Sequence, residues 1–471
     1  MESKLNFKTE KNVFYEQISN TSLSFMGKYY QDSLANQYQY LIPADSRVLE
    51  LGCGSGDLLA SLDPQFGVGI DFSKSKINKA KQLHPHLQFI LGDVHDIHLG
   101  DVRFDYIVFS DLVNDIYDVQ ELLLKIKPYC NKHTRLVFNF YSRLWGAPLA
   151  IARFFKLARP VDMQNWLTRH DMINLLEISG YEPIRSWSEF LMPIPVPVIS
   201  NFINRYFSKL PLFQHLCLAN FMVARPLMAK DSAKPTVSIV IAARNESGHI
   251  QDLIDRVPLF GGTQPEVIFV EGNSTDDTYE VIKKLIEGKP GFKLLKQPGK
   301  GKGDAVRTGF EAATGDILMI LDADITVPPE DLPKFYELIE SGKGEFINGV
   351  RLVYPMDKDA MRFANLVGNK FFSWAFSWLL SQPIRDTLCG TKVLKRTDYL
   401  RIADNRLYFG DFDPFGDFDL IFGAAKLNLK IVEVPIRYRA RVYGETNISR
   451  WTHGWLLLEM VAFAARRVKF V

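Results

Sequence analysis

The chain of 471 residues is too long for one ordinary hydrophobic core, so its length indicates two or three domains. Its content of 47% hydrophobic and 23% charged residues is typical of a folded globular protein and excludes a disordered chain. The formal net charge of +2 gives no reason to expect a nucleic-acid partner.

Neither the N-terminal segment nor the cysteines indicate export. Residues 1–20 are polar and mixed in charge, and they lack the apolar run of a secretory signal. The four cysteines lie far apart without a CxxC pair, a spacing that fits neither a zinc site nor a disulfide framework. They are Cys53, Cys130, Cys217 and Cys389. We therefore expect a cytoplasmic protein.

Four segments are more apolar than a typical surface, although none reaches the roughly 18–20 uninterrupted apolar residues of a membrane-spanning helix. Each segment is interpreted either as a buried core helix or as a helix in a membrane interface, with Trp, Phe and basic residues at its edges. The segments are residues 136–158, 190–213, 366–384 and 455–470.

Apolar, β-branched runs alternate with Gly-rich turns and helical patterns in two series, each with a βαβ rhythm. The first series begins at residues 47–56 and the second at residues 236–246. Between them, residues 226–235 lose the hydrophobic period and gain Ala, Lys, Asp, Ser and Pro. We predict two doubly wound α/β domains. They cover residues 1–228 and 236–471, with a linker at residues 229–235.

In the first series a predicted strand runs into three alternating glycines, Gly52, Gly54 and Gly56, and then into a helix. Glycines allow the backbone to approach a ligand closely, and the helix N-terminus favours negative charge. Asp71 ends the next strand, where a carboxylate can accept hydrogen bonds from ribose hydroxyls. The GxGxG spacing, in place of GxGxxG, argues against a nicotinamide site.

The motifs ELGCGSG, GVGID, LGDVHDI and FDYIVFSDLVNDI follow one another within residues 45–130. Together they resemble the motifs of class I S-adenosylmethionine-dependent methyltransferases. The resemblance implies a Rossmann-like fold and S-adenosylmethionine as the cofactor. By family position it implies eight cofactor-binding residues. They are Glu50, Gly52, Gly54 and Gly56 at the methionine part, Asp71 at the ribose, Asp93 and Val94 at the adenine, and Ser110 at the transferred methyl, which the neighbouring Asp111 would also face.

The methyl acceptor cannot be read in the same way, because methyl transfer mainly needs a positioned nucleophile and the family has no universal catalytic residue. Four polar residues are candidate contacts for an acceptor hydroxyl, although each can also be an ordinary loop or cap residue. They are His95, Asp111, Asn114 and Asp115. An alternative interpretation is a degenerate domain that keeps the fold as a binding or scaffold module.

In the second series an apolar strand at residues 317–321 ends in Asp322-Ala323-Asp324. Two carboxylates that flank one residue at a strand end project into the crevice where ligands bind in open α/β sheets. Such oxygen ligands suit Mg²⁺ or Mn²⁺ shared with a diphosphate. The metal would neutralise charge as a nucleoside diphosphate leaves. A lone DxD also occurs in turns and caps.

The DxD motif does not stand alone. SIVIAARNESGHI, VIFVEGNSTDDT, KGKGDAVRTGF and GDILMILDADITVPPEDL occur in order within residues 236–450. They resemble family-two glycosyltransferases of the GT-A fold, and most closely the dolichyl- or polyprenyl-phosphate sugar synthases. The resemblance implies a nucleoside diphosphate sugar as the donor, and a polyprenyl phosphate or a lipid-linked glycan as the acceptor.

By matching position the resemblance implies a donor site and a metal site. The residues are Ala243, Asn245, Glu246 and Glu271 around the nucleotide, Lys302, Asp304 and Arg307 near its phosphates, and Asp322 and Asp324 at the metal, with Asp324 favoured as the direct ligand. The family usually has a second acid after the position of Glu271. Gly272 occupies that place here, so the nucleotide stays open between uridine and guanosine.

Further along, Asp417 and Asp419 begin a helical pattern where relatives carry an acidic pair near the acceptor. Asp417 is the first candidate general base, and Asp419 the second. Such a base would deprotonate a sugar hydroxyl so that it can attack the anomeric carbon. A lipid phosphate is already ionised and needs no base, and Asp417 can also be a helix N-cap.

Arginines cluster after that helix, at 437, 439, 441 and 450. Guanidinium groups bind phosphate bidentately, which suits a diphosphate or a prenyl phosphate. The matching family pattern ends in Ser-Lys, whereas this chain has Thr446-Asn447, so we expect the acceptor phosphate at Arg351, Arg441 and Arg450. A solvated basic strand is the alternative.

These patterns together predict a bifunctional enzyme. We expect metal-dependent, inverting sugar transfer at the cytoplasmic membrane face, with residues 451–470 along the lipid surface, and methylation of a related intermediate. Two other interpretations stay open. A nucleotidyltransferase shares the layout and the metal aspartate but opens with a different Gly-rich loop, and a scaffold protein would have two degenerate pockets.

Overall fold

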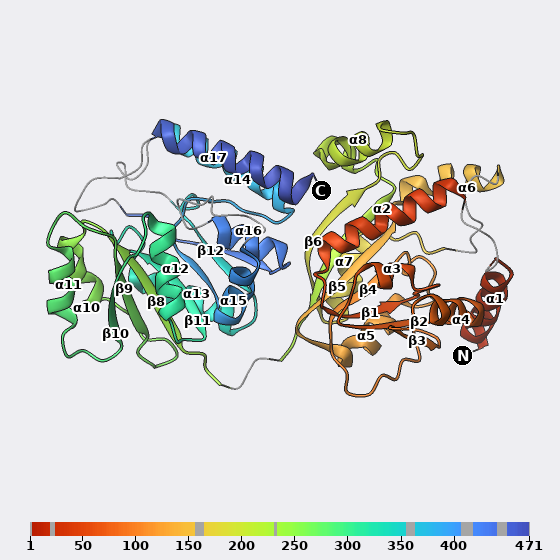
Figure 1. Cartoon of the computed structure of the whole chain (residues 1–471), viewed down its shortest axis with the longest axis horizontal. Helices are drawn as coiled ribbons and strands as arrows, with labels where there is room; N and C mark the ends of the chain where they lie inside the picture. Colours follow the sequence, from red (N-terminus) through yellow and green to blue (C-terminus); the bar gives the residue numbers. More distant parts are fainter. Residues whose placement is uncertain are drawn as a thin grey trace. The chain divides into compact units, whose positions relative to one another are not determined.

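The chain forms two compact units. The first comprises residues 1–228 with 470–471, and the second comprises residues 229–469. The structure, a computed structural model, describes residues 2–18, 24–155, 164–229, 233–354, 363–406, 418–439 and 450–470. Each unit has one seven-stranded mixed sheet with helices on both faces (Figure 1). This confirms the predicted fold class of two α/β domains.

The sheet of the first unit has the order β3-β2-β1-β4-β5-β7-β6. Its strands are β1 (Arg47–Leu51), β2 (Phe66–Asp71), β3 (Gln88–Leu91), β4 (Phe104–Ser110), β5 (Cys130–Tyr141), β6 (Tyr181–Glu189) and β7 (Ala219–Pro226). Strands β1 to β5 are parallel, whereas β7 pairs antiparallel with β5 and with β6. The strand order reverses between β1 and β4. Ligands bind at the carboxyl ends of the strands beside such a switch point.

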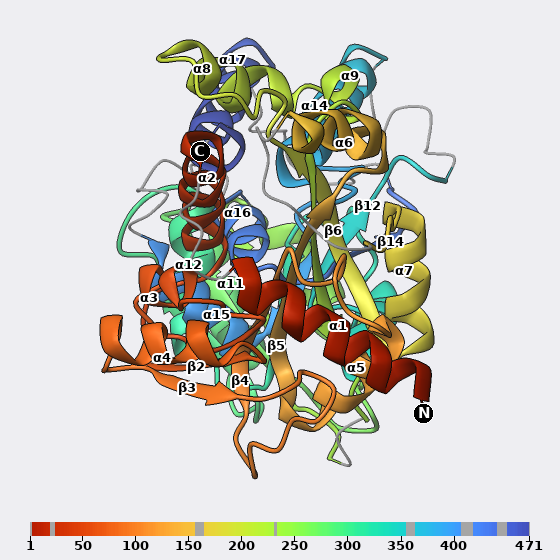
Figure 2. The same ribbon diagram turned by 90° about the vertical axis from the view of Figure 1, so that its right-hand side faces the viewer.

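Helices of the first unit cover both faces of this sheet. They are α1 (Glu2–Ile18), α2 (Phe25–Leu41), α3 (Asp57–Ser61), α4 (Lys74–Leu83), α5 (Val119–Ile126), α6 (Gly146–Phe154), α7 (Arg169–Ile178), α8 (Ile199–Tyr206) and α9 (Pro211–Gln214). Buried residues of α5 and α7 pack on one face, and those of α2, α3 and α4 pack on the other (Figure 2). The sequence favours this layering because α2, α3, α4, α5 and α7 carry apolar residues that need a sheet face to cover them.

The sheet of the second unit has the order β10-β9-β8-β11-β13-β12-β14. Its strands are β8 (Val237–Ala243), β9 (Glu266–Glu271), β10 (Phe292–Lys296), β11 (Ile317–Asp322), β12 (Phe346–Val350), β13 (Lys392–Lys395) and β14 (Ile431–Pro435). The order reverses between β8 and β11, which are parallel, and β13 is antiparallel to both of its neighbours. Both β8 and β11 are continuous apolar runs, as expected for strands covered on two faces.

Helices of the second unit divide between two cores. They are α10 (Ile250–Asp255), α11 (Thr278–Ile286), α12 (Lys302–Ala312), α13 (Leu332–Glu340), α14 (Phe363–Leu380), α15 (Arg396–Asp404), α16 (Phe418–Lys426) and α17 (Arg450–Ala464), which continues into a π-helical turn at Ala465–Lys469. Buried side chains of α10, α11 and α13 share one core, and those of α12 and α14 to α17 share the other.

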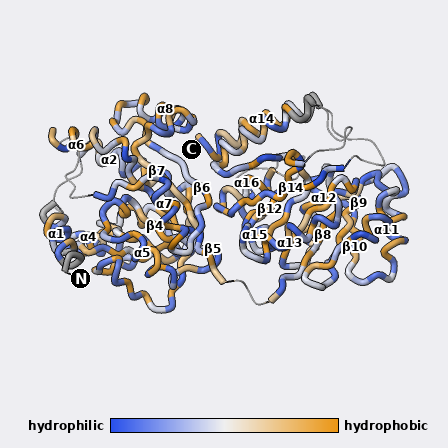
Figure 3. The backbone as a smooth tube through the Cα atoms, turned by 180° about the vertical axis from the view of Figure 1, so that it is seen from behind, coloured by the Kyte–Doolittle hydropathy of each residue, from blue (hydrophilic) through white to orange (hydrophobic). Residues whose placement is uncertain are grey.

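The apolar segment at residues 366–384 is partly a core helix and partly a surface. Within α14, Phe376 and Leu380 are fully buried, whereas Trp374 is 61% exposed. Figure 3 shows apolar residues also along α6 and α8 of the first unit, outside its sheet. Among the residues that the structure describes, no helix is both long and apolar enough to cross a bilayer.

Candidate functional site

The glycine loop after β1 lies at the switch point of the first unit. Gly52, Gly54 and Gly56 have φ angles of 73°, 53° and 76°, in the left-handed region that favours glycine. A Cβ on Gly56 would lie 2.5 Å from the ring of Phe89, so this glycine allows close packing. A Cβ on Gly54 would meet nothing within 4 Å, so the loop is open there to a ligand.

Asp71 ties the end of β2 to this loop. Its carboxylate accepts hydrogen bonds from the backbone N–H of Gly54 at 2.9 Å and from that of Ser73 at 2.9 Å. Burial raises the pKa of Asp71 from its ordinary value, although these hydrogen bonds and Lys76 oppose that shift. A carboxylate offers about four acceptor sites, so ribose hydroxyls can still be bound.

Glu50 in β1 is buried, with only 3% of its surface exposed. Its Oε2 atom has no hydrogen-bond partner among the described residues. Burial raises the pKa of Glu50 well above its ordinary value, and nearby Asp71 and Asp57 add to that rise. A buried oxygen of this kind can accept from a donor outside the protein, such as the ammonium group of an amino-acid moiety.

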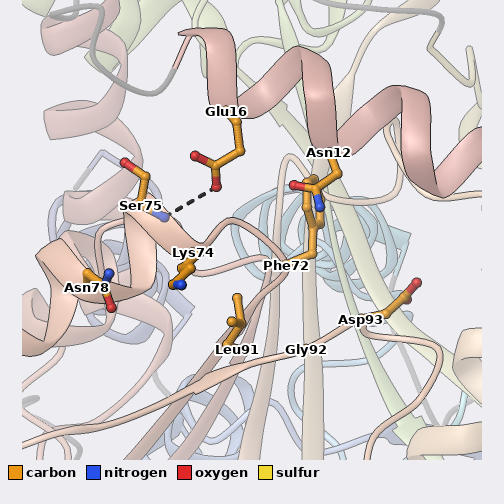
Figure 4. Close-up of a pocket in the computed structure, with 9 residues that line it drawn as sticks. All are labelled: Asn12, Glu16, Phe72, Lys74, Ser75, Asn78, Leu91, Gly92 and Asp93. Carbon is orange, nitrogen blue, oxygen red and sulfur yellow. Dashed lines mark hydrogen bonds between the residues drawn. The ribbon is translucent and has the colours of Figure 1, made fainter.

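A pocket of about 670 Å³ lies beside the ends of β2 and β3. Asn12 and Glu16 project into it from α1, towards the residues that follow β2 (Figure 4). Glu16 accepts hydrogen bonds from Ser73 Oγ at 2.9 Å and from the N–H of Ser75 at 3.2 Å. The lining residues are Asn12, Glu16, Phe72, Lys74, Ser75, Asn78, Leu91, Gly92 and Asp93. Sequence reasoning missed Asn12 and Glu16, because nothing local in the polar N-terminal helix links it to a strand end. It also missed Phe72, which directly follows the strand end at Asp71.

The remaining residues implied for the cofactor lie at different depths. Asp93 lines the pocket and accepts hydrogen bonds from the N–H of His95 at 2.7 Å and from its Nδ1 at 3.0 Å. Val94 is buried in the core, and Ser110 ends β4 with a partly exposed side chain. Asn114, a candidate acceptor contact, donates to the carbonyl of Asn165 at 2.7 Å and is buried.

The second unit brings a cation to the DxD motif. Nζ of Lys302, the first residue of α12, lies 2.6 Å from Oδ1 of Asp322, the last residue of β11. Burial would raise the pKa of Asp322, but the charge and hydrogen bond of Lys302, together with the charges of Lys392 and Arg351, lower it. Gly390 passes directly against this pair, because a Cβ there would lie 2.0 Å from Oδ2 of Asp322. Sequence reasoning missed Gly390.

Asp324 is oriented by the turn that follows it. Its Oδ1 accepts hydrogen bonds from the N–H of Thr326 at 3.2 Å and from its hydroxyl at 2.8 Å. Among the described residues no group of three His, Cys, Asp or Glu side chains is placed to hold a metal. The two aspartates nevertheless fit a Mg²⁺ or Mn²⁺ ion, since Mg²⁺ is usually bound by one or two carboxylates together with substrate phosphates.

Turns after β8 and β9 are tied together beside this motif. Asn245, with a φ of 57°, accepts a hydrogen bond from the N–H of Thr275 at 2.8 Å. The N–H of Gly272 donates to the carbonyl of Ala243 at 2.9 Å, and the N–H of Ser274 donates to Glu271 at 2.5 Å. These contacts hold three residues implied for the nucleotide at one edge of the sheet.

Two other donor-site residues are engaged within the protein. The buried Glu246 accepts from Nδ1 of His249 at 2.9 Å. Asp304 accepts from the N–H of Gly299 at 2.8 Å and so closes the Gly-rich loop before α12. Both hydrogen bonds stabilise turns of the chain, and neither is evidence that the residue binds a nucleotide.

The acceptor candidates are only partly described. Asp419 in α16 faces two cations, with Arg406 Nε at 3.6 Å and Arg307 Nη1 at 3.9 Å. Arg351 makes a buried bidentate ion pair with Asp386, at 2.7 and 2.9 Å. Three candidates fall outside what the structure describes. They are Asp417, Arg441 and the side chain of Arg450.

Family models match both halves of the chain. The model described as glycosyl transferase family 2 matches residues 238–408, and a methyltransferase-domain model matches residues 42–164. A dolichol-phosphate mannosyltransferase of Pyrococcus furiosus is 34% identical over 243 residues, which is 50% of this chain and 67% of that protein. These matches confirm the two predicted resemblances and their order.

Three further proteins are similar to parts of the chain. A dolichyl-phosphate hexose transferase of Haloferax volcanii is 28% identical over 46% of this chain and 89% of its own length. The chain spans only 54% of a low-salt glycan biosynthesis hexosyltransferase of the same organism, at 28% identity over 49% of the chain. A glucosyl-3-phosphoglycerate synthase from Mycobacterium tuberculosis, solved with Mn²⁺ and UDP, has a TM-score of 0.38 and 22% identity, and covers 50% of this chain and 80% of its own.

Proposed function

This chain belongs to glycosyl transferase family 2 and carries a methyltransferase domain before its glycosyltransferase domain. On this premise we propose that it is a bifunctional enzyme. The second unit would transfer a sugar from a nucleoside diphosphate to a polyprenyl phosphate or a membrane-linked glycan. The first would methylate a related intermediate. The observation that carries the proposal is the grouping of Asp322, Asp324 and Lys302 at the switch point between β8 and β11.

For sugar transfer, Asp322 and Asp324 would hold a divalent cation. The cation, when bound, supplies charge neutralisation for the departing diphosphate. Lys302 would donate to a phosphate oxygen from the start of α12, where the helix N-terminus also favours an anion. A phosphate acceptor needs no base, so Asp419 would then keep Arg307 and Arg406 in place. Arg441 and Arg450 remain predicted ligands of the acceptor phosphate.

For methyl transfer, the first unit would bind S-adenosylmethionine along the ends of β1 to β3. The cofactor supplies an activated methyl group when bound. Glu50 would accept from its ammonium group, Asp71 from its ribose, and Asp93 would lie beside its adenine. Two observations support this placement: the Cβ direction of Gly54 is open, and Oε2 of Glu50 accepts no hydrogen bond from the described residues. A domain that binds the cofactor without turnover is the alternative.

We also propose peripheral contact with the cytoplasmic membrane face through α14 and α17. Exposed apolar side chains support this contact, with exposed Arg466 and Arg467 after them to meet anionic headgroups. The exposed fractions are 53% for Val367, 49% for Phe371, 61% for Trp374, 66% for Trp455 and 43% for Leu458.

Vesicle flotation of the full chain tests this contact. With phosphatidylcholine–phosphatidylglycerol vesicles, the double variant Phe371→Ser/Trp374→Ser should lose at least about tenfold in partitioning, because each large apolar side chain contributes about 1.5–3 kcal/mol on burial. The control is Leu259→Ser/Leu400→Ser, which changes equally exposed apolar residues elsewhere on the unit. Equal losses in both double variants would refute the assignment of α14 to the lipid surface.

Calorimetry of the full chain tests the two catalytic assignments. The ligands are S-adenosylmethionine, UDP, GDP and their sugar conjugates, each with and without Mn²⁺. We expect S-adenosylmethionine to bind without metal and one nucleotide to bind only with it, which would also decide between uridine and guanosine. If no nucleotide binds under either condition, the transferase proposal fails and a scaffold role replaces it.

A further inference from the structure

Asp111 directly follows the end of β4, where the transferred methyl group is expected. Asp111 adopts a φ of 54°, which is uncommon for a residue with a side chain, so the turn there is held by its surroundings. Asn139 of β5 pairs with Ser110 of β4 and places its amide beside this turn. The N–H of Asp111 donates to Oδ1 of Asn139 at 3.2 Å.

Hydroxyl and amide groups from separate elements converge on this carboxyl. Oδ1 of Asp111 accepts hydrogen bonds from the Tyr30 hydroxyl at 2.9 Å and from Nδ2 of Asn139 at 2.5 Å. The Tyr38 hydroxyl donates to Oδ1 of Asn139 at 2.7 Å and fixes the amide in that orientation. The Tyr141 side chain lies near Asp111 and acts to lower the pKa of its carboxyl group.

Aromatic rings form walls around the cluster. The rings of Tyr30 and Tyr141 stack at 6.0 Å, and Phe190 lies edge-on to Tyr30 at 5.5 Å. Asp111, Tyr30 and Tyr141 are each partly buried. The cluster brings hydroxyl groups and a carboxylate together just after the carboxyl end of β4, beside the switch point where ligands bind in such sheets.

Other charged groups set the electrostatics of the cluster. Asp115 lies near Asp111 and is paired with Lys11 of α1 at 3.4 Å, and it also accepts from the Tyr15 hydroxyl. The positive charge of Arg153 of α6 acts to lower the pKa of Tyr141. Burial raises the pKa of Asp111 to about 7. The negative charge of Asp115 adds to this rise, whereas the hydrogen bonds from Tyr30 and Asn139 oppose it.

We propose that Asp111 is the general base for methylation of a hydroxyl, which makes the first unit an O-methyltransferase whose acceptor binds beside Asp111, next to the stacked rings of Tyr30 and Tyr141. The proposal rests on the proposed cofactor site. The acceptor oxygen bonds to the methyl carbon while the carbon–sulfur bond breaks and leaves its electron pair on sulfur. Asp111 takes the hydroxyl proton. A base that titrates near neutrality suits this role, whereas a carboxylate acceptor would need none.

Tyr30 is a positioning and binding residue in this scheme. Its hydroxyl orients the carboxylate through Oδ1, and its ring bounds the acceptor site. Tyr30→Phe should therefore lower methylation without moving the pH dependence. Asp111→Asn should remove the rising limb near pH 7 together with at least about 100-fold of the rate, the usual contribution of a general base.

Methylation of a matched acceptor series by the full chain tests the proposal. Glucose, glucosamine and glucuronate offer the same ring with hydroxyl, amine or carboxylate groups, and mass spectrometry locates the methyl. We expect O-methylation of at least one sugar, lost in Asp111→Asn. Methylation only at the amine or the carboxylate, an unchanged pH profile in Asp111→Asn, or no O-methylation by the parent chain would each overturn the proposal.

Two readouts besides turnover complete the test. Affinity for S-adenosylmethionine, measured by calorimetry, should change less than about threefold in Asp111→Asn, and failure of the parent chain to bind it would instead sink the proposed function. Because the folded-state pKa of Asp111 is raised, its stabilisation is complete below pH 4 and is lost as the pH rises through about 7. The melting temperature of Asp111→Asn, measured relative to that of the parent chain at the same pH, should therefore increase from pH 5 to pH 8.

Discussion

Replacing Asp324 by alanine is expected to reduce sugar transfer at least about 1,000-fold, because a bound metal supplies several kcal/mol of charge stabilisation and about 1.4 kcal/mol corresponds to a factor of ten. The variant keeps Asp322 with its partner Lys302, so the crevice retains that ion pair. The measurement is transfer of radiolabelled sugar to a polyprenyl phosphate in the presence of Mn²⁺ or Mg²⁺.

A matched control separates this loss from general damage. Asp255→Ala removes an exposed aspartate on α10 whose side chain accepts a hydrogen bond from Gln251 at 2.8 Å, and we expect full activity. A chelator should bring the parent chain down to the residual rate of Asp324→Ala and leave that variant unchanged. Metal-dependent turnover that survives in Asp324→Ala would contradict the assignment of the metal site.

The second large effect is on stability, at the pair formed by Arg351 and Asp386. The Asp386 side chain is completely buried and accepts from Nε, Nη2 and the backbone N–H of Arg351, and from Nδ2 of Asn369 at 3.0 Å. Asp386→Ala leaves the guanidinium buried without its partner, which should cost about 3–5 kcal/mol. Calorimetric unfolding should show the transition of the second unit lowered by roughly 10 °C.

Removing both charges is the control for this pair. Arg351→Met/Asp386→Leu should recover part of the loss, because no uncompensated charge stays buried. Burial alone would raise the pKa of Asp386, but the charge and hydrogen bonds of Arg351 lower it. Because the pKa of Asp386 is lower in the folded than in the unfolded state, its carboxylate stabilises the fold above the unfolded pKa, and this stabilisation is lost as the pH falls. The difference in unfolding free energy between the parent chain and Asp386→Ala should therefore shrink below about pH 4.

This pair also bears on the acceptor phosphate. Sequence reasoning assigned Arg351 to that phosphate because the residue type suits phosphate, but two of its donors are committed to Asp386. If the double variant recovers stability and still transfers sugar, the role of Arg351 is structural. Loss of transfer in a double variant of normal stability would support the phosphate role.

Local patterns in the sequence were sufficient for the fold class and the family. Strand, glycine turn and helix follow one another within about ten residues around Gly54, and around Asp324 a strand, a turn with two prolines and a helix follow one another. Backbone conformation and hydrophobic period are set by near neighbours, so short motifs determine them. The motifs also located the carboxyl ends of β1, β2 and β11, since parallel strands in a βαβ series present those ends to one edge.

Only the tertiary structure decided which side chains meet. Lys302 reaches Asp322, Gly390 leaves room for that pair, and Tyr30 reaches Asp111 across 81 positions of sequence separation. Such contacts depend on strand order and on how helices pack across a sheet, and no period or local propensity encodes them. The sequence therefore determined where chemistry could occur along the chain, and packing decided which of these groups act together.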